Sequence, residues 1–242
     1  MSTTLVLYVF HEYNERVKYF MENAVFLDKD VDFYIVCNNK HITFEHPYYI
    51  KILRRENIGY DFGGWSEALL TNDFYKKYDN FIFVNSSVIG PFLPSISTLK
   101  WTDIFLNGLT GETRLFGATI NTLRQPLDKS HLQSYIFCMN KETLEYLIQC
   151  KIFSLANHAK TMLEAIFNKE VMMSRKIIEN DWNIGSLLPY YKGVDFRFKA
   201  KKPQFYNVIF LDDVMFQGYY RKLWTEYDLV FVKGNRIKLS NM

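Results

Sequence analysis

Short hydrophobic runs alternate with helical periodicity along the first hundred residues. The run Thr4–Phe10 (TLVLYVF) is continuous and rich in β-branched and aromatic side chains, which is typical of a strand buried on both faces of a parallel sheet. Asn14 can then cap a helix whose apolar residues repeat at i, i+3, i+4, i+7 and i+8, namely Val17, Phe20, Met21, Ala24 and Val25. Further runs predict strands at 32–37, 49–53 and 80–84, and a helix at 65–70.

Polar residues cluster where each of these predicted strands ends, at 11–14, 38–40, 54–61 and 85–87. Alternating strands and helices predict an α/β fold with a mostly parallel central sheet and helices on both faces. Open sheets of this kind bind ligands at the carboxyl ends of their strands. Surface loops are polar in any protein, and that explanation suffices for a single cluster. Recurrence at every predicted strand end favours a ligand site.

The second part of the chain continues the pattern. The further elements expected are strands at 114–120, 133–139, 183–188 and 229–233 and a helical region at about 160–179. Asn140 can cap a helix that carries Leu144, Leu147 and Ile148 on one face. Because no linker, repeat or low-complexity tract interrupts the chain, we expect one domain over residues 1–242.

Composition narrows the class of protein. Hydrophobic residues make up 48% and aromatic residues 17% of the chain, enough to bury a core. The formal charge of +3 is far below the basic excess typical of nucleic-acid binding, so we expect no nucleic-acid partner. Three scattered cysteines form neither a CxxC pair nor a zinc spacing, which favours reduced thiols. With no basic segment before the first apolar run and no apolar stretch of about 20 residues, we expect a cytoplasmic protein without a transmembrane segment.

Residues 57–65 (NIGYDFGGW) form the most specific local motif. Its three glycines favour a loop that a ligand can approach closely, and the following helix amino terminus would favour a phosphate. Asp61 can accept hydrogen bonds from a sugar hydroxyl or a base NH. The same residues fit a tight turn in which Asp61 caps the helix, and both interpretations stay open. The motif is neither GxGxxG nor a P-loop, which disfavours dehydrogenases and P-loop NTPases.

The spacing Asn57-x-Gly59-x-Asp61-x-Gly63, followed by the aromatic strand FIFVNSSVIGPF at 81–92, resembles glycosyltransferases of the GT-A fold, particularly those related to the rhamnan synthesis F proteins. The resemblance spans roughly residues 5–195. It implies a GT-A-like (Rossmann-like) fold with a nucleotide-sugar-binding half at 1–100 and an acceptor-side half at 101–242.

The resemblance also implies a reaction and a donor site. A hexose or deoxyhexose would pass with inversion from a UDP, GDP or dTDP sugar to a glycan or another hydroxyl acceptor in polysaccharide biosynthesis. His11 and Glu12 would border the nucleotide, and Asp61 would contact the nucleoside or sugar. The implied donor-binding residues are His11, Asn57, Gly59, Asp61, Gly63, Asn85, Ser86 and Ser87.

Metal dependence is open. In the similar glycosyltransferases, Asn85–Ser87 would stand where an Asp-x-Asp usually binds Mn²⁺ or Mg²⁺, yet these side chains offer only neutral oxygens. Either the diphosphate of the donor largely holds the metal, or cations neutralise that diphosphate instead. Candidate cations are Arg54, Arg55 and Lys192, and Asp212 and Asp213 are weak candidates for metal ligands.

Glu170 is the candidate general base. It shares an i, i+3, i+4, i+7 face with apolar residues of the 160–179 region, where burial would raise its basicity. Alternatively, Asn168 caps a new helix and Glu170 lies in its first turn. His131 and Gln133, just before a predicted strand, could reach an acceptor sugar.

Two other functions compete with the glycosyltransferase. A catalytically inactive nucleotide- or sugar-binding module of the same fold would explain the missing Asp-x-Asp. A nucleotidyltransferase would need a carboxylate-bound Mg²⁺, which the carboxylate-poor strand end disfavours.

Overall fold

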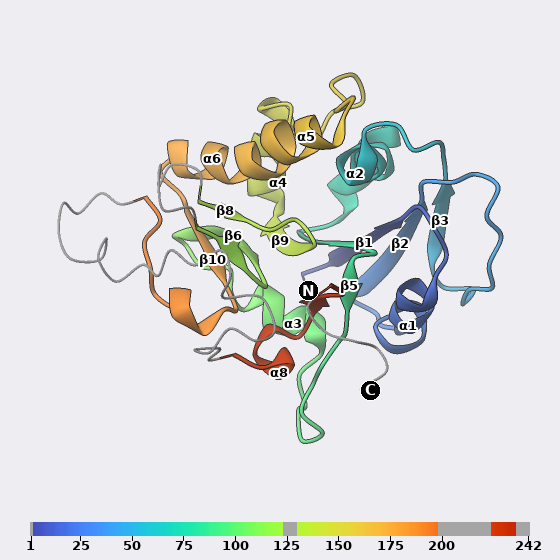
Figure 1. The fold of residues 1–242 in the computed structure, drawn as a ribbon, viewed down its shortest axis with the longest axis horizontal. Helices are drawn as coiled ribbons and strands as arrows, with labels where there is room; N and C mark the ends of the chain where they lie inside the picture. Colours follow the sequence, from blue (N-terminus) through green and yellow to red (C-terminus); the bar gives the residue numbers. More distant parts are fainter. Residues whose placement is uncertain (1, 123–129, 198–223, 236–242) are drawn as a thin grey trace.

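A computed structural model describes residues 2–122, 130–197 and 224–235, and a seven-stranded sheet forms its centre (Figure 1). The strands, in the order β10-β6-β9-β4-β1-β2-β3, are Asn183–Ser186, Thr113–Gly117, Ile136–Asn140, Asn80–Asn85, Thr4–Phe10, Val31–Cys37 and Lys51–Arg54. Only β9 runs antiparallel to its neighbours, β4 and β6. The expected mostly parallel α/β sheet is confirmed.

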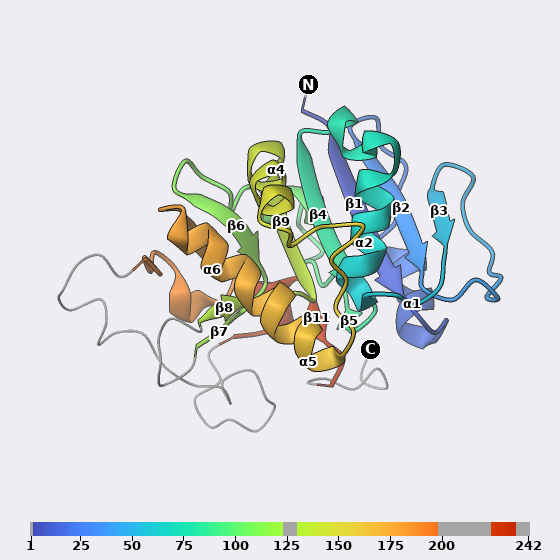
Figure 2. The ribbon, with the colours of Figure 1, turned by 90° about the horizontal axis from the view of Figure 1, so that it is seen from above.

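Helices cover both faces of this sheet, as expected (Figures 1 and 2). One face carries α1 (Glu15–Asn23) and α3 (Trp101–Leu106). The other carries α2 (Tyr60–Leu70), α4 (Lys141–Gln149) and a continuous helical segment made of α5 (Met162–Glu164), η3 (Ala165–Val171) and α6 (Met172–Glu179). The smaller elements are η1 (Thr71–Lys77), β5 (Val88–Ile89), β7 (Ile120–Asn121), β8 (His131–Leu132), η4 (Pro189–Tyr191), α8 (Glu226–Leu229) and β11 (Val232–Lys233).

Helix α1 shows how local sequence positions an element. The Asn14 side chain accepts hydrogen bonds from the amides of Arg16 (3.1 Å) and Val17 (3.3 Å), which caps the helix as predicted. Its apolar stripe is buried, and the Phe20 ring stacks on Tyr8 of β1 with 3.9 Å between ring centroids. Asn140 likewise caps α4 by accepting from the amide of Thr143 (3.0 Å).

Helix α2 begins earlier than its sequence indicates, at Tyr60 instead of residue 65. Gly59 precedes it with a φ of 78°, and Gly63 and Gly64 lie inside the helix. A Cβ at Gly63 would come within 2.0 Å of the Ile58 carbonyl oxygen. These glycines therefore permit close packing of the helix and do not form a loop, so the loop interpretation of 57–65 is wrong beyond Gly59.

Other boundaries also differ from expectation. The strand expected at 114–120 divides into β6 and β7, and the one at 133–139 begins at Ile136. Within 160–179 the helix takes a π-helical turn over Ala165–Val171, so no new helix starts at Asn168. At 229–233, Leu229 closes α8 before β11 begins.

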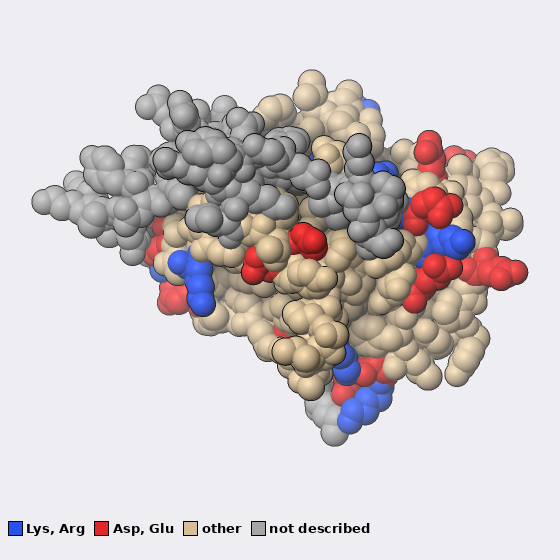
Figure 3. Space-filling model, turned by 60° about the horizontal axis from the view of Figure 1, so that its bottom comes forward, with Lys and Arg blue, Asp and Glu red and all other residues tan. Residues whose placement is uncertain are grey.

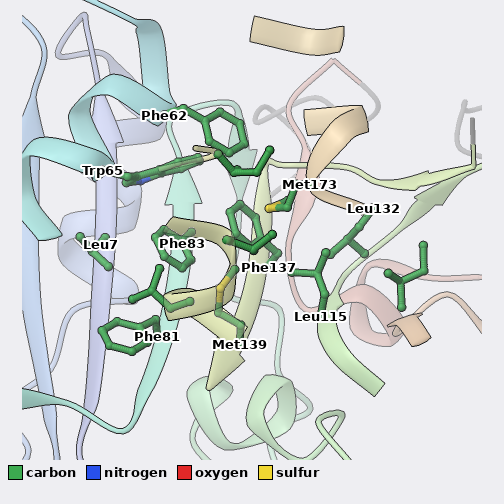
Figure 4. Packing of buried hydrophobic residues seen from close by; sticks show 14 of the residues in the cluster. Leu7, Phe62, Trp65, Phe81, Phe83, Leu115, Leu132, Phe137, Met139 and Met173 are labelled. Carbon is green, nitrogen blue, oxygen red and sulfur yellow. The ribbon is translucent and has the colours of Figure 1, made fainter. Parts of the chain in front are cut away.

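Trp65 joins α2 to the sheet. Its fully buried ring lies 5.2 Å from Phe62 and 5.5 Å from both Phe83 of β4 and Phe137 of β9, measured between centroids (Figure 4). Phe83 and Phe137 stack at 4.7 Å. This aromatic cluster fixes the position of α2 on the face of the sheet.

The face that carries α1 and α8 shows mixed charges. Figure 3 shows Lys and Arg interspersed with Asp and Glu among the described residues of this face, with no continuous basic surface.

We expect Trp65→Ala to lower the free energy of unfolding by about 3–5 kcal/mol, because it empties the centre of the aromatic cluster. Trp65→Phe should lose less than half as much, since the indole Nε1 has no hydrogen-bond partner in the structure. Urea denaturation measures both. Tyr48→Ala, at a side chain 89% exposed, is the control and should stay within about 0.5 kcal/mol of the wild type. An equal loss in all variants would contradict this account of the core.

Candidate functional site

A cavity of about 330 Å³ opens at the carboxyl end of β4. Helix α2, the segment after β4, the segment between β8 and β9, the α5–η3 helix and β11 all contribute to it. Its lining residues are Tyr60, Asp61, Phe62, Asn85, Ser86, Ser87, Gln133, Ser134, Tyr135, Met162, Ala165, Ile166, Glu170 and Lys233. Six residues singled out from the sequence therefore meet in one place: Asp61, Asn85, Ser86, Ser87, Gln133 and Glu170.

Asn85 connects the two predicted donor segments. Its Nδ2 donates to Asp61 Oδ2 at 2.9 Å, and its Oδ1 accepts from the amide (3.0 Å) and hydroxyl (2.6 Å) of Ser87. The side chain is thus held in one orientation, because its oxygen is already paired within its own turn. The other carboxylate oxygen of Asp61, Oδ1, takes no part in this bond to Asn85.

Burial raises the pKa of Asp61 to about 6, against the hydrogen bond from Asn85, which lowers it. The negative charge of Glu170 raises this pKa further, and the ammonium of Lys233 lowers it. Two carboxylates that face one cavity thus influence each other. Asp61 is ionised at neutral pH but is a stronger base than an ordinary aspartate.

Glu170 lies opposite, on the π-helical turn. Its Oε2 accepts from the amide of Ser134 (2.7 Å) and from the Ser134 hydroxyl, and its Oε1 lies 3.6 Å from His131 Nε2. Burial raises the pKa of Glu170, but the hydrogen bonds from His131 and Ser134 outweigh it and leave the pKa below its ordinary value. The expectation that burial would make Glu170 more basic is wrong, because these donors stabilise the carboxylate.

The segment 54–59 supports the site from outside the cavity. The Arg55 guanidinium is buried and donates to Asn38 Oδ1 (2.6 Å), Glu67 Oε2 (2.7 Å) and the Ile58 carbonyl (2.8 Å). Arg54 is exposed and lies over the Phe44 ring at 5.4 Å. Neither arginine lines the cavity, and their suggested contact with a diphosphate stays a prediction.

The other residues predicted from the sequence are not among the described residues that line this cavity. His11 Nδ1 is 2.8 Å from the Asn38 carbonyl oxygen, and His131 is buried behind Glu170. Gly59 and Gly63 shape the start of α2, and Asn57 is exposed just before it. Lys192 lines a different cavity, along β10. Asp212 and Asp213 lie outside the described residues, as do 198–223 in general.

Lys233 is the charged cavity residue that the sequence did not suggest, and Ser134, which hydrogen-bonds Glu170, was not suggested either. β11 pairs antiparallel with β5, and the Gly234 amide donates to the Ser87 carbonyl at 2.6 Å. This pairing brings a lysine from the carboxyl-terminal part of the chain beside Asn85–Ser87. Among the described residues, no group of three or more His, Cys, Asp or Glu side chains could hold a metal ion.

Fold and site together define an α/β protein with a polar cavity at the carboxyl ends of parallel strands. Residues 35–216, more than half of the chain, match the family described as rhamnan synthesis protein F, and the chain belongs to this family. The family name indicates a role in glycan biosynthesis. The comparison with curated proteins gave no match. Within the described residues, no helix has the length and apolar character needed to cross a membrane.

We expect Asp61→Asn to stabilise the fold at about pH 7.5. Because the folded-state pKa of about 6 exceeds the ordinary value of 3.8, stability falls as pH rises through this window, and ionised Asp61 costs the fold about 3 kcal/mol above it. The amide oxygen of the substituted side chain can still accept the hydrogen bond from Asn85 Nδ2. Thermal unfolding should show a higher Tm than the wild type at pH 7.5 and no gain at about pH 4. A lower Tm at both values would contradict the raised pKa.

Proposed function

We propose that the chain is a glycosyltransferase that moves a hexose or deoxyhexose from a nucleotide sugar to a glycan hydroxyl, with a GT-A-like arrangement of its sites. The observation that supports it most is the cavity at the carboxyl end of β4, where Asp61, Asn85 and Glu170 meet. Open α/β sheets bind nucleotides at this edge. Membership of the rhamnan synthesis protein F family supports the sugar chemistry.

The donor is proposed to lie against α2 and the 85–87 segment. Asp61 would accept hydrogen bonds from ribose or sugar hydroxyls, and Ser86 and Ser87 would offer neutral hydrogen bonds. Lys233 would attract the diphosphate, which a cation in a partly closed cavity binds well. UDP, GDP and dTDP sugars are the candidate donors.

A divalent metal fits these residues poorly. The strand end supplies an amide and two hydroxyls, and the amide oxygen of Asn85 is already paired with Ser87. Asp61 is one carboxylate, whereas Mn²⁺ and Mg²⁺ prefer several charged oxygens. We therefore propose that Lys233 takes part of the role that a metal has in related enzymes.

Glu170 is proposed as the base of an inverting reaction. The hydrogen bonds from Ser134 keep it ionised at neutral pH, so it can take the proton of the acceptor hydroxyl. The acceptor oxygen would bond to the anomeric carbon as the bond to the diphosphate breaks. Gln133, which lines the cavity, would position the acceptor, and His131 would act through Glu170. Donor contacts then come mainly from residues 1–100 and acceptor contacts from 101–242.

The first experiment offers UDP, GDP, dTDP and CDP sugars to the wild type, with and without Mn²⁺, and measures thermal stabilisation and nucleoside diphosphate release. We expect one nucleotide class to stabilise the protein and turn over. In a parallel assay with the corresponding NTPs, release of pyrophosphate would identify a nucleotidyltransferase instead. Binding without turnover would identify an inactive module.

Glu170→Gln tests the proposed base. It should lower transfer by about 10²-fold or more, because a glutamine cannot accept the proton, while donor binding stays close to that of the wild type. Glu179→Gln is the matched control, since its side chain is 56% exposed on the same helical segment. Equal activity in the two variants would sink the assignment of Glu170.

A further inference from the structure

Lys169 is a buried lysine on the π-helical turn that also carries Glu170. The residue is 3% exposed, and burial lowers the pKa of its ammonium to about 8. Its Nζ donates to the carbonyl oxygen of Lys151 at 2.7 Å and to that of Ile152 at 3.0 Å. Because an ammonium is costly to bury without polar partners, these two bonds determine where the side chain lies.

Both acceptors lie just past the carboxyl end of α4, whose last residue is Gln149. The carboxyl end of a helix carries partial negative charge and leaves carbonyl groups without helical partners, so it binds a cation well. Lys151 has a φ of 62°, the left-handed conformation in which many helices end. Lys169 therefore contacts a helix end of defined geometry.

The chain after α4 is itself anchored to α2. Phe153 is fully buried, and its ring centroid lies 5.8 Å from that of Phe62. The Ser154 amide donates to the Ser66 Oγ at 3.0 Å. Phe62 and Ser66 both belong to α2, the helix that carries Asp61. The carbonyls that Lys169 contacts are thus fixed relative to the donor side of the cavity at the end of β4 (the β4 cavity).

Lys169 and Glu170 hold the same turn from different sides. Neighbouring residues point about 100° apart in an α-helix and somewhat less in a π-helical turn. Glu170 lines the β4 cavity and accepts from the Ser134 amide, whereas Lys169 is not among the lining residues. Two contacts on different sides of a helix fix its rotation about its own axis. That rotation decides whether the Glu170 carboxylate reaches the cavity.

We propose that Lys169 is the positioning residue of Glu170: its bonds to the carbonyls of Lys151 and Ile152 hold the π-helical turn at the rotation that keeps the carboxylate at the β4 cavity. The role of Glu170 as a base rests on the proposed glycosyltransferase function. The positioning of its carboxylate rests only on the contacts described above.

Carbon-13 NMR titration of the Glu170 carboxylate tests the positioning without any turnover. Lys169→Met removes the N–H donors at nearly the same length, so the turn should rotate and take the carboxylate away from Ser134. Burial would then outweigh the remaining hydrogen bonds, and the pKa of Glu170 should be higher than in the wild type. The variant keeps the titratable groups that contact Glu170 or share its cavity, which are His131, Asp61, Lys233, Tyr60 and Tyr135.

Two further variants make this comparison specific. Lys169→Gln keeps N–H donors on a side chain one atom shorter, so its Glu170 pKa should fall between those of the wild type and Lys169→Met, and it carries the test if the methionine variant does not fold. Lys176→Met is the matched control, because this lysine is on the same helical segment, has a side chain that is 34% exposed and pairs with Glu179. The control should leave the pKa of Glu170 unchanged.

Sugar transfer by the same variants tests the link to the reaction. Lys169→Met should lower kcat about tenfold or more, because a displaced base is poorly aligned with the acceptor hydroxyl, while the donor KM stays within about twofold. The acidic limb of its kcat profile should also move to higher pH, in step with the pKa of Glu170. Lys176→Met should match the wild type in all three quantities.

Failure of this proposal can be separated from failure of the proposed function. An unchanged Glu170 pKa in the Lys169 variants overturns the positioning role, whether or not kcat falls, and leaves the transferase in place. A pKa that rises in the Lys169 variants alone supports the positioning role, even when the wild type turns over no nucleotide sugar and the proposed function is thereby contradicted.

Discussion

The buried guanidinium of Arg55 is the interaction on which the geometry of the site depends. One planar group joins the end of β2, through Asn38, to the body of α2, through Glu67, and to the Ile58 carbonyl just before that helix. Its side chain is 5% exposed, so removing it would leave the buried Asn38 oxygen without this partner and would break the links to Glu67 and to the Ile58 carbonyl. The start of α2, and with it the position of Asp61, is set here. Trp65 holds the same helix to the sheet through its contacts with Phe83 and Phe137 in the core.

The two carboxylates of the β4 cavity are held in unlike environments. Burial raises the pKa of Asp61 towards neutral pH. The donors of His131 and Ser134 lower the pKa of Glu170 and keep its carboxylate charged. Environments that separate the pKa values of neighbouring acids are characteristic of functional sites. In the β4 cavity the group whose burial is unfavourable, Asp61, is one that we propose a ligand contacts.

Local patterns predicted most of the sheet and several site residues. Strands β1, β2 and β4 and the caps Asn14 and Asn140 follow from short-range periodicity and from side-chain hydrogen bonds within a few residues. Asp61 and Asn85–Ser87 could be named because parallel strands bring their carboxyl ends together. Glu170 could be named because a charge on an apolar stripe is conspicuous.

What could not be predicted depends on contacts distant in sequence. Lys233 reaches the cavity through the pairing of β11 with β5, which no local motif signals. The lowered pKa of Glu170 comes from His131 and Ser134, the second of which is 36 residues away in the chain. Arg55 resembles a solvated charge until its partners are known. The glycines of α2 were misinterpreted because a glycine required by close packing has the same sequence signature as one required by a loop.

The most direct test of the donor site is hydrogen–deuterium exchange with UDP, GDP and dTDP at about 1 mM. The account predicts that the nucleotide which binds slows exchange in peptides covering 58–64, 85–87 and 165–171, which surround the β4 cavity. Binding with protection confined to 108–117 and 183–194 would place the nucleotide in the other cavity, along β10, instead. That result, or no protection by any nucleotide, would contradict the central claim.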